Sequence, residues 1–326
     1  MTGAEVVTVT ANPAIDHTVW VPGFAAGEVN RVAHETATAG GKGVNVAADL
    51  AALGVSTVVT GFLGRDNVAV FESRFAAASI ADRFVRVDGS TRTNMKIVDD
   101  GRPGFTTDVN FPGIGPSPTD VDDLTELVAE LSADARWVVL AGSLPPDAPG
   151  DLYARLVDAA HDSDALVAVD TSGPALAAAV AATPDLIKPN RSELESLLDR
   201  ALPDDAALLG AIDDLRGRGI ANVVVSLGGD GAIFATEKGT VRAPAAPIAV
   251  VSTVGAGDAM VAGTIAGLLR EEPLDAVAAI ATACSAQVLS SVGTEVDPAA
   301  VQITAESLDI EVLGTRAGTA EEGEAR

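Results

Sequence analysis

The chain has 326 residues, of which 48% are hydrophobic, and a formal net charge of −25 at pH 7. This length and hydrophobic content suffice for one large α/β domain and exclude wholesale disorder, while the negative charge excludes general binding to nucleic acid. The single cysteine, Cys284, excludes a disulfide within the chain and the spacing of a zinc finger.

The first residues contain no basic region followed by a long apolar run, so we expect no secretory signal. An uninterrupted apolar stretch of about 18 residues is also missing, which predicts no membrane span. These features fit a cytoplasmic protein. The acidity has two interpretations that the sequence leaves open: adaptation to a saline cytoplasm, or the acidic surface of a protein from a GC-rich genome.

In chain order, residues 6–10 are predicted as a first strand, 18–21 and 31–36 as short extended pieces, and 44–53 as a helix that stops at Gly54. Strand-like and helix-like runs then alternate. The strands are predicted at residues 57–61, 137–141, 166–170, 185–187 and 223–227, and the helices at 119–131, 152–160 and 205–216. Such alternation predicts a mostly parallel sheet covered by helices on both faces.

One segment departs from this alternation. Residues 93–98 and 105–110 are predicted as two strands joined by the turn-rich residues 99–102, and no helix separates them. This hairpin is either a flap over a site or a decorative edge of the sheet. Near the C-terminus, residues 317–326 are small, polar and acidic, and we predict a disordered tail there.

Three glycine clusters follow or join predicted strands, at residues 39–45, 227–231 and 253–258. Their spacing is not that of a P-loop, and a GxGxxG after the first strand is missing, which disfavours a nicotinamide enzyme. Their shared position near one end of the sheet is where open α/β sheets bind ligands.

The third cluster has the most specific pattern. Gly255, Ala256 and Gly257 precede Asp258 and an apolar helical run at 259–269. Backbone amides at a helix start can hold a transferring phosphoryl group, and Asp258 could accept a proton from an attacking hydroxyl. The same helix start would lower the pKa of Asp258 and weaken it as a base. The alternative is that Asp258 is only a helix N-cap.

A polar motif follows the predicted strand at 185–187. Asn190 and Glu193 are three residues apart, so they face the same way on a first helical turn. They could hold a hydrated Mg²⁺ through water. The alternative is a capping box, with Asn190 as the N-cap and Glu193 at the third helical position.

Taken in this order, the motifs resemble those of the phosphofructokinase-B (ribokinase-like) family of carbohydrate kinases over nearly the whole chain. The segments that carry the resemblance are residues 10–16, 40–45, 142–146, 188–193 and 252–258. The resemblance implies a ribokinase-like three-layer α/β/α domain over residues 1–316, with a small β-sheet lid from about 17–36 and 93–110. It also implies ATP and Mg²⁺ as cofactors and a homodimer formed through the lid.

The resemblance also implies roles for single residues. Asp258 matches the catalytic base, and Gly255, Ala256 and Gly257 match the anion hole. The positions implied for the sugar are Asp16, Gly40, Gly41, Asn45 and Ser143. The positions implied for nucleotide and metal are Lys188, Asn190, Ser226, Gly228 and Gly231, with Glu193 bound to the metal through water. Residues around Cys284 are expected to line the adenine pocket.

Within the family, Lys42 and the segments 27–31 and 91–94 are most similar to those of the 1-phosphofructokinase and tagatose-6-phosphate kinase branches. A kinase of phosphorylated sugars needs fixed cations for the phosphate already present, and Lys42, Arg31 and Arg92 are the candidates. For the two arginines, the alternative is a solvated surface charge. The expected reaction is the ATP-dependent phosphorylation of fructose 1-phosphate to fructose 1,6-bisphosphate. Alternatives are tagatose 6-phosphate or fructose 6-phosphate as substrate, or a non-catalytic sugar-phosphate-binding protein.

Overall fold

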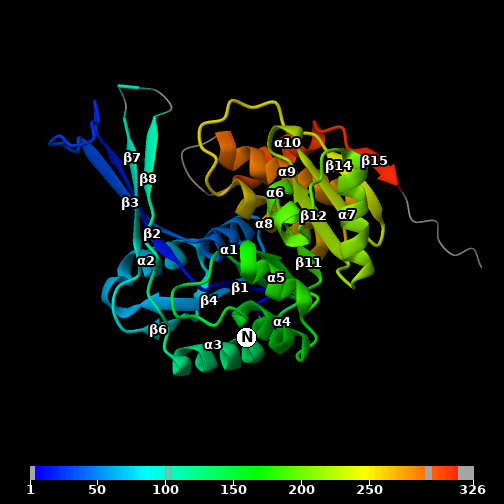
Figure 1. Cartoon of the computed structure of the whole chain (residues 1–326), viewed down its shortest axis with the longest axis horizontal. Coiled ribbons are helices and arrows are strands. Elements are labelled where there is room, and N and C mark those ends of the chain that lie inside the picture. The colour runs from blue at the N-terminus through cyan, green and yellow to red at the C-terminus, as the bar shows by residue number, and fades with distance from the viewer. Residues whose placement is uncertain (1–3, 100, 103–104, 291–295, 315–326) are drawn as a thin grey trace, which may run out of the picture.

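The computed structural model describes residues 4–99, 101–102, 105–290 and 296–314. A large sheet lies between two groups of helices, and a smaller sheet stands beside it (Figure 1). Within the described residues, no helix is long and apolar enough to cross a membrane. The acidic tail predicted at 317–326 lies outside them.

The large sheet begins at an antiparallel edge and continues as a parallel sheet. Its order is β15 (Glu311–Gly314), β14 (Gly239–Ala243), β13 (Ala232–Thr236), β12 (Asn222–Ser226), β11 (Leu186–Ile187), β10 (Leu166–Asp170), β9 (Trp137–Ala141), β1 (Val6–Thr10), β4 (Thr57–Gly64) and β5 (Ala81–Asp82), with β6 (Val85–Val87) paired to β4. Strands β12 to β15 pair antiparallel and the other pairs are parallel. The strands predicted at residues 6–10, 57–61, 137–141, 166–170, 185–187 and 223–227 all lie in this sheet.

Helices cover both faces of the large sheet, so the predicted three-layer α/β fold is confirmed. One group comprises α3 (Pro118–Ser132), α4 (Leu152–His161), α5 (Gly173–Ala181), α6 (Arg191–Leu198) and α7 (Asp205–Gly217), and the other α1 (Lys42–Ala52), α8 (Ala256–Leu269), α9 (Leu274–Ser290) and α10 (Pro298–Glu306). Successive side chains of a strand point to opposite faces of the sheet. In β9, Val138 packs with the first group of helices and Val139 with the second. Both faces of β9 are therefore buried.

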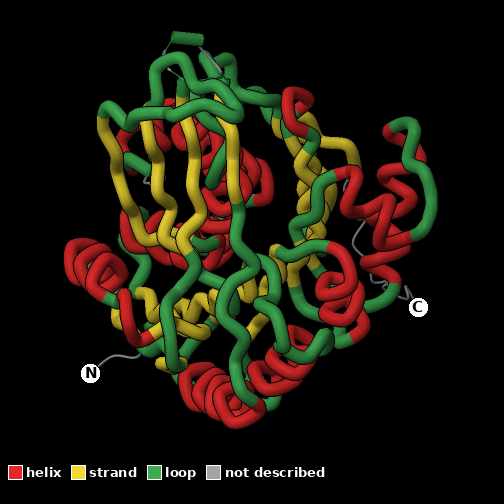
Figure 2. The backbone as a smooth tube through the Cα atoms, turned by 60° about the vertical axis from the view of Figure 1, so that its left-hand side comes forward, coloured by secondary structure: helices red, strands yellow, loops and turns green. Residues whose placement is uncertain are grey.

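The smaller sheet has the order β3 (His34–Gly40), β2 (Ala14–Trp20), β7 (Thr93–Val98) and β8 (Thr106–Val109), with its strands side by side (Figure 2). The predicted hairpin is β7–β8, and β2 and β3 occupy the predicted extended region. Strand β2 starts at Ala14, before the predicted piece 18–21, and β3 starts within the predicted piece 31–36 but continues beyond it, because the two strands pair as far as Ala14 and Gly40. The described parts of the predicted lid segments contribute to this sheet; its movement over a site stays a prediction.

Local sequence explains how three helices begin near one another. Helix α1 follows Gly41, whose φ of 114° favours glycine, and α8 follows Gly255, whose φ is 85°. Helix α6 follows Asn190, which caps it through its side chain. Each helix continues a segment that arrives at the carboxyl edge of the sheet, so their N-termini surround one region.

Candidate active site

Side chains from several elements meet at the carboxyl edge of the parallel strands. Asp170 ends β10, and Lys188 directly follows β11. Lys42 and Asn45 come from the first turn of α1, and Asp258 from the first turn of α8. This edge is where open α/β sheets bind ligands.

Two lysines and two aspartates alternate within this cluster. The Nζ atom of Lys42 lies 2.8 Å from Oδ2 of Asp170 and 3.5 Å from Oδ1 of Asp258, and Nζ of Lys188 lies 3.1 Å from Oδ1 of Asp170. Burial alone would raise the pKa of Asp170, but Lys188 and Lys42 outweigh it and hold that pKa below its usual range. Asp170 is therefore ionised and links the two cations.

Asp258 is the third residue of α8, and the N-cap is Gly255, which makes no side-chain cap. The interpretation of Asp258 as a helix N-cap is therefore wrong. Burial raises the pKa of Asp258 to about 6, against the opposing effect of Lys42, and the charge of Asp170 adds to the increase. The lowering expected from the helix start is outweighed by burial. A carboxylate with this pKa can act as a general base near neutral pH.

The glycines before Asp258 leave room at the start of α8. A Cβ atom on Gly257 would lie 3.3 Å from Nζ of Lys188, so a side chain there would crowd the buried lysine. The first N–H groups of a helix have no partner within the helix and attract anions. Gly255, Ala256 and Gly257 therefore present backbone donors beside the Asp258 carboxylate. Lys188, which was predicted to bind the nucleotide, lies next to Gly257.

The Asn45 side chain connects α1 to α8. Its Nδ2 atom donates a hydrogen bond of 2.9 Å to Oδ2 of Asp258. Gly40, just before α1, has no room for a side chain, since a Cβ atom would lie 2.0 Å from Oδ2 of Asp16. The glycine segment, with Gly41 at φ 114°, thus brings Asp16 and Asn45 to the same side of the cluster.

Asp16 lies in β2, at the base of the smaller sheet. It accepts a hydrogen bond of 3.3 Å from Nδ2 of Asn94 in β7. Burial raises the pKa of Asp16, and the Asn94 hydrogen bond and the charges of Arg92, Lys96 and Arg74 oppose the increase. This carboxylate lies in the junction between the two sheets.

Arg92, a candidate for binding the phosphate, and Ser143, a candidate for binding the sugar, lie near this junction. The Arg92 guanidinium donates to three backbone carbonyls, those of Asn12, Pro13 and Phe111. Ser143 accepts a hydrogen bond of 3.3 Å from Nδ2 of Asn12. In this structure Arg92 stabilises the base of the smaller sheet through these three hydrogen bonds.

Arg31 is not brought to the cluster. It is exposed in the connection before β3, and β3 then runs from His34 to Gly40. Six residue steps of a strand span about 20 Å. Arg31 therefore lies near the far end of the smaller sheet, away from Lys42.

The residues predicted for the nucleotide adjoin one another. Asn190 forms an isolated parallel bridge with Ser226, whose N–H donates to the carbonyl of Pro189 at 3.1 Å. Gly228 and Gly231 have φ angles of 61° and 83° in the turn that follows β12. A side chain on Gly231 would collide with the carbonyl oxygen of Ala243, 2.0 Å from the Cβ position.

Asn190 and Glu193 form the predicted capping box. The N–H of Asn190 donates to Oε2 of Glu193 at 2.8 Å, and the N–H of Glu193 to Oδ1 of Asn190 at 2.9 Å. Burial lowers the pKa of Lys42, but the charges of Asp170 and Asp258 outweigh it and raise that pKa above its usual range, and the charge of Glu193 adds a smaller increase. Glu193 therefore lies close enough to act electrostatically on the cluster around Asp258.

Cys284 is fully buried in the packing of α9 against α8, where a Cβ atom on Gly263 would lie 3.0 Å from its Sγ atom. Any contact of this region with the adenine of a nucleotide would therefore come from residues beside Cys284.

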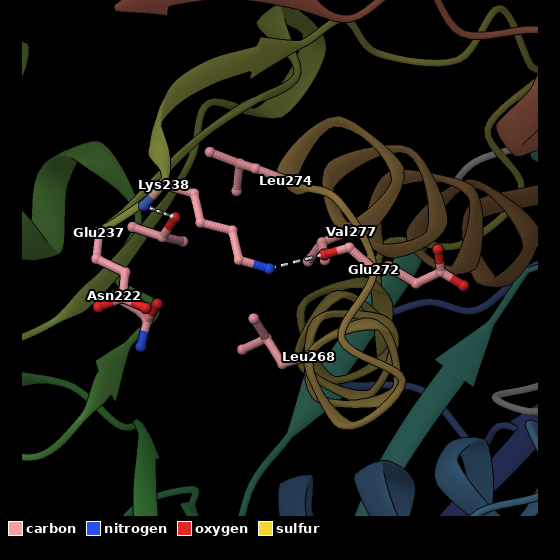
Figure 3. Close-up of a pocket in the computed structure, with 8 residues that line it drawn as sticks. Asn222, Glu237, Lys238, Leu268, Glu272, Leu274 and Val277 are labelled. Atoms are coloured by element: carbon pink, nitrogen blue, oxygen red, sulfur yellow. Dashed lines mark hydrogen bonds between the residues drawn. The ribbon is translucent and has the colours of Figure 1, made fainter. Parts of the chain in front are cut away.

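A small cavity lies at the other end of the large sheet (Figure 3). Asn222 starts β12 and Thr236 ends β13, so both mark the edge opposite Asp258. Lys238 reaches across the cavity and donates to the carbonyl of Glu272 at 3.3 Å. The cavity has a volume of about 60 Å³, which is room for a few water molecules. The cluster around Asp258 is separate from this cavity.

Two charged residues in or beside the cluster were missed in the sequence. Asp170 had a usable signal, because an acidic residue at the end of a buried strand is unusual. Arg74 had none: it comes from α2 (Ala69–Ala78), and its contact with Asn45 depends on how α2 packs.

Residues 5–300 match the model of the pfkB family of carbohydrate kinases. The 1-phosphofructokinase of Rhodobacter capsulatus is 46% identical over 297 residues, covering 90% of this chain and 93% of the relative. That of Escherichia coli K12 is 39% identical over 286 residues, covering 88% and 91%. The solved tetrameric inhibited form of phosphofructokinase-2 from Escherichia coli superposes with a TM-score of 0.86 at 27% identity, covering 93% of this chain and 98% of that one.

Proposed function

Because this chain belongs to the pfkB family of carbohydrate kinases, we propose that it transfers the γ-phosphoryl group of ATP to the free primary hydroxyl of fructose 1-phosphate. The product is fructose 1,6-bisphosphate. The observation that carries the proposal is the buried Asp258 carboxylate, held by Asn45 at 2.9 Å beside Lys42 at 3.5 Å. The predicted cytoplasmic location stays a prediction.

Each group in the cluster has a role in this reaction. Asp258 orients the sugar hydroxyl and accepts its proton as the new O–P bond forms and the bond to the leaving oxygen breaks. In a loose transition state little deprotonation is needed before transfer, so orientation is the larger contribution. The backbone N–H groups at the start of α8 stabilise the charge on the transferred phosphoryl oxygens.

The position of Lys42 favours a role at the transferred phosphoryl group. Its ammonium lies between the carboxylates of Asp170 and Asp258, at 2.8 and 3.5 Å. A phosphate already on the sugar lies at the other end of the substrate from the reacting hydroxyl. Lys42 therefore suits the γ-phosphoryl group better than the existing phosphate, which leaves the junction near Arg92 and Ser143 for the latter.

The residues present fit a hydrated Mg²⁺ better than a metal held directly by the protein. Across the described ranges, no three His, Cys, Asp or Glu side chains are grouped to hold a metal. Glu193 uses Oε2 to cap α6, and a carboxylate retains further acceptor capacity. Together with Asn190 it could bind metal-bound water, as Mg²⁺ prefers. When bound, Mg²⁺ would neutralise phosphate charge.

We also propose that the smaller sheet is a lid through which two copies of the chain associate. Apolar side chains are exposed on or beside this sheet; they are Val29, Val32, Phe105, Val109 and Phe111. A second copy that covered them would remove this surface from water. Lid movement, or the lid of a second copy, could bring Arg31 to a phosphate that it does not reach in this structure.

A substrate panel tests the proposed function. Purified protein is assayed with ATP and Mg²⁺ on fructose 1-phosphate, fructose 6-phosphate and tagatose 6-phosphate. We expect the highest kcat/KM with fructose 1-phosphate. A higher value with either 6-phosphate would reject the substrate, and turnover of none would support the non-catalytic alternative. Asp258→Asn should retain sugar-phosphate binding and lose turnover by orders of magnitude.

A further inference from the structure

Arg74, which lies in α2 outside the cluster, contacts the cluster residue Asn45. Phe71 and Phe75 anchor α2 in a core that also contains Val44 and Ala47 of α1. Arg74 lies next to this buried face and is half-buried. Its Nη1 atom donates to the carbonyl of Ala39 and, at 3.2 Å, to Oδ1 of Asn45. Arg74 thus connects α2 to the side chain that holds Asp258.

The chemistry of the groups makes this connection directional. A guanidinium has only donors, whereas an amide has one acceptor end and one donor end. With Arg74 at Oδ1, the Nδ2 end of Asn45 must face Asp258, where it donates at 2.9 Å. If the amide were reversed, its NH₂ group would face the Arg74 guanidinium, which is also a donor. Its oxygen would then face the negatively charged Asp258 carboxylate.

We propose that Arg74 is a positioning residue of this active site, which holds the Asn45 amide in the orientation that binds the Asp258 carboxylate. The nature of the reaction rests on the proposed function, while the connection between the three side chains does not. Arg74 acts through Asn45 and is not itself catalytic. A second effect reaches Asp16, whose negative charge Arg74 also stabilises.

The other groups around Asp258 remain when Arg74 is changed. They are Lys42 from α1, Asp170 from the end of β10 and Lys188 from the residue after β11. The Asn45 hydrogen bond is one of the interactions that lower the pKa of Asp258. Losing it raises that pKa, so a smaller fraction of the base is ionised at acidic pH.

The test compares Arg74→Met and Arg74→Ala with the wild type and with Arg86→Met. Arg86 is a matched control because it is half-buried and lies 4.0 Å from Glu72 of α2, but pairs with Asp82 instead of contacting the cluster. Carboxyl-carbon NMR titration follows Asp258 directly in the full-length protein. We expect its midpoint to rise by about one pH unit in both Arg74 variants and to stay unchanged in Arg86→Met.

Kinetics provide a second readout. A rise from pH 6 to pH 7 in the Asp258 midpoint would lower kcat/KM about fivefold at pH 6 and leave it nearly unchanged at pH 8. In an Asn45→Ala background, Arg74→Met should have no further effect on this pH dependence, because its path to Asp258 is gone. A loss of packing alone would lower activity equally at both pH values.

The outcomes separate this proposal from the proposed function. If Asp258 titrates alike in wild-type protein and in a folded Arg74 variant, the positioning role is wrong, whatever the substrate. The same holds if Arg74→Met keeps its effect without Asn45. Two variants are used so that one failing to fold leaves the other decisive. If no sugar phosphate in the panel is turned over, the NMR titration still decides the role of Arg74.

Discussion

Replacing Asp258 by Asn should make the folded protein more stable at neutral pH while it removes turnover. The reason is that burial raises the pKa of this carboxyl from 3.8 to about 6. Each pKa unit corresponds to about 1.4 kcal/mol, so ionised Asp258 costs the fold about 3 kcal/mol at pH 7. Asn resembles the neutral acid in shape and its oxygen can still accept from Asn45, so it avoids this cost.

The sign of the pH dependence follows from the direction of the shift. Because the folded protein holds the Asp258 proton up to about pH 6 and the unfolded chain releases it near 3.8, wild-type stability falls as pH rises through that window. The advantage of Asp258→Asn should therefore be absent near pH 4 and complete above about pH 7. Urea denaturation at several pH values measures it, with the denaturant slope checked for constancy.

Asp170→Asn is the matched comparison, since its carboxylate lies in the same cluster with a shift of opposite sign. The pKa of Asp170 is held low by Lys188 and Lys42 against the effect of burial, so its charge stabilises the fold at neutral pH. Asp170→Asn should therefore lose stability at pH 7, and lose less as pH falls and the wild-type carboxylate itself becomes protonated. If Asp258→Asn were less stable than the wild type at pH 7, our account of the Asp258 environment would be refuted.

Three further predictions concern other parts of the chain. Gly40→Ala should raise KM for the sugar phosphate several-fold or more, because the Cβ position of Gly40 lies 2.0 Å from Oδ2 of Asp16. Gly150→Ala is the control and should leave the kinetics unchanged, since no atom lies within 4 Å of its Cβ position. Equal KM values for the two variants would contradict the placement of Asp16. Val109→Asp in the smaller sheet should yield monomers by light scattering, while Val312→Asp on β15 should not; a Val109→Asp dimer would exclude association through this sheet. If the charge of −25 reflects a saline cytoplasm, the unfolding free energy should rise steadily up to molar KCl, and a flat or falling profile would favour the GC-rich interpretation.

Much of the large sheet could be predicted because its strands are short apolar runs buried on both faces. Residues 137–141 and 166–170 were predicted with the bounds of β9 and β10. Strand β2 was harder: it begins at Ala14, directly after Pro13, and its middle residues are only partly buried. Its extent is set by pairing with β3 and β7, which a local pattern does not contain.

The candidate site shows the same division. Asp258, Asn45 and the glycines around them were predicted from motifs, and the structure places Asn45 and Asp258 in direct contact. The pKa direction of Asp258 was predicted wrongly, because the helix start is visible in the sequence while the depth of burial is not. Arg74 was beyond prediction, since it reaches Asn45 from another helix, 29 residues along the chain.

The separation between the small cavity near Lys238 and the cluster around Asp258 has a practical consequence for chemical screening. A search for inhibitors that starts from this small cavity would begin at the wrong end of the molecule, where the space of about 60 Å³ suits only a few water molecules. Compounds aimed at turnover must instead occupy an open, highly charged edge. Such compounds would need to mimic phosphate or ribose, and shape complementarity alone would select poorly among them.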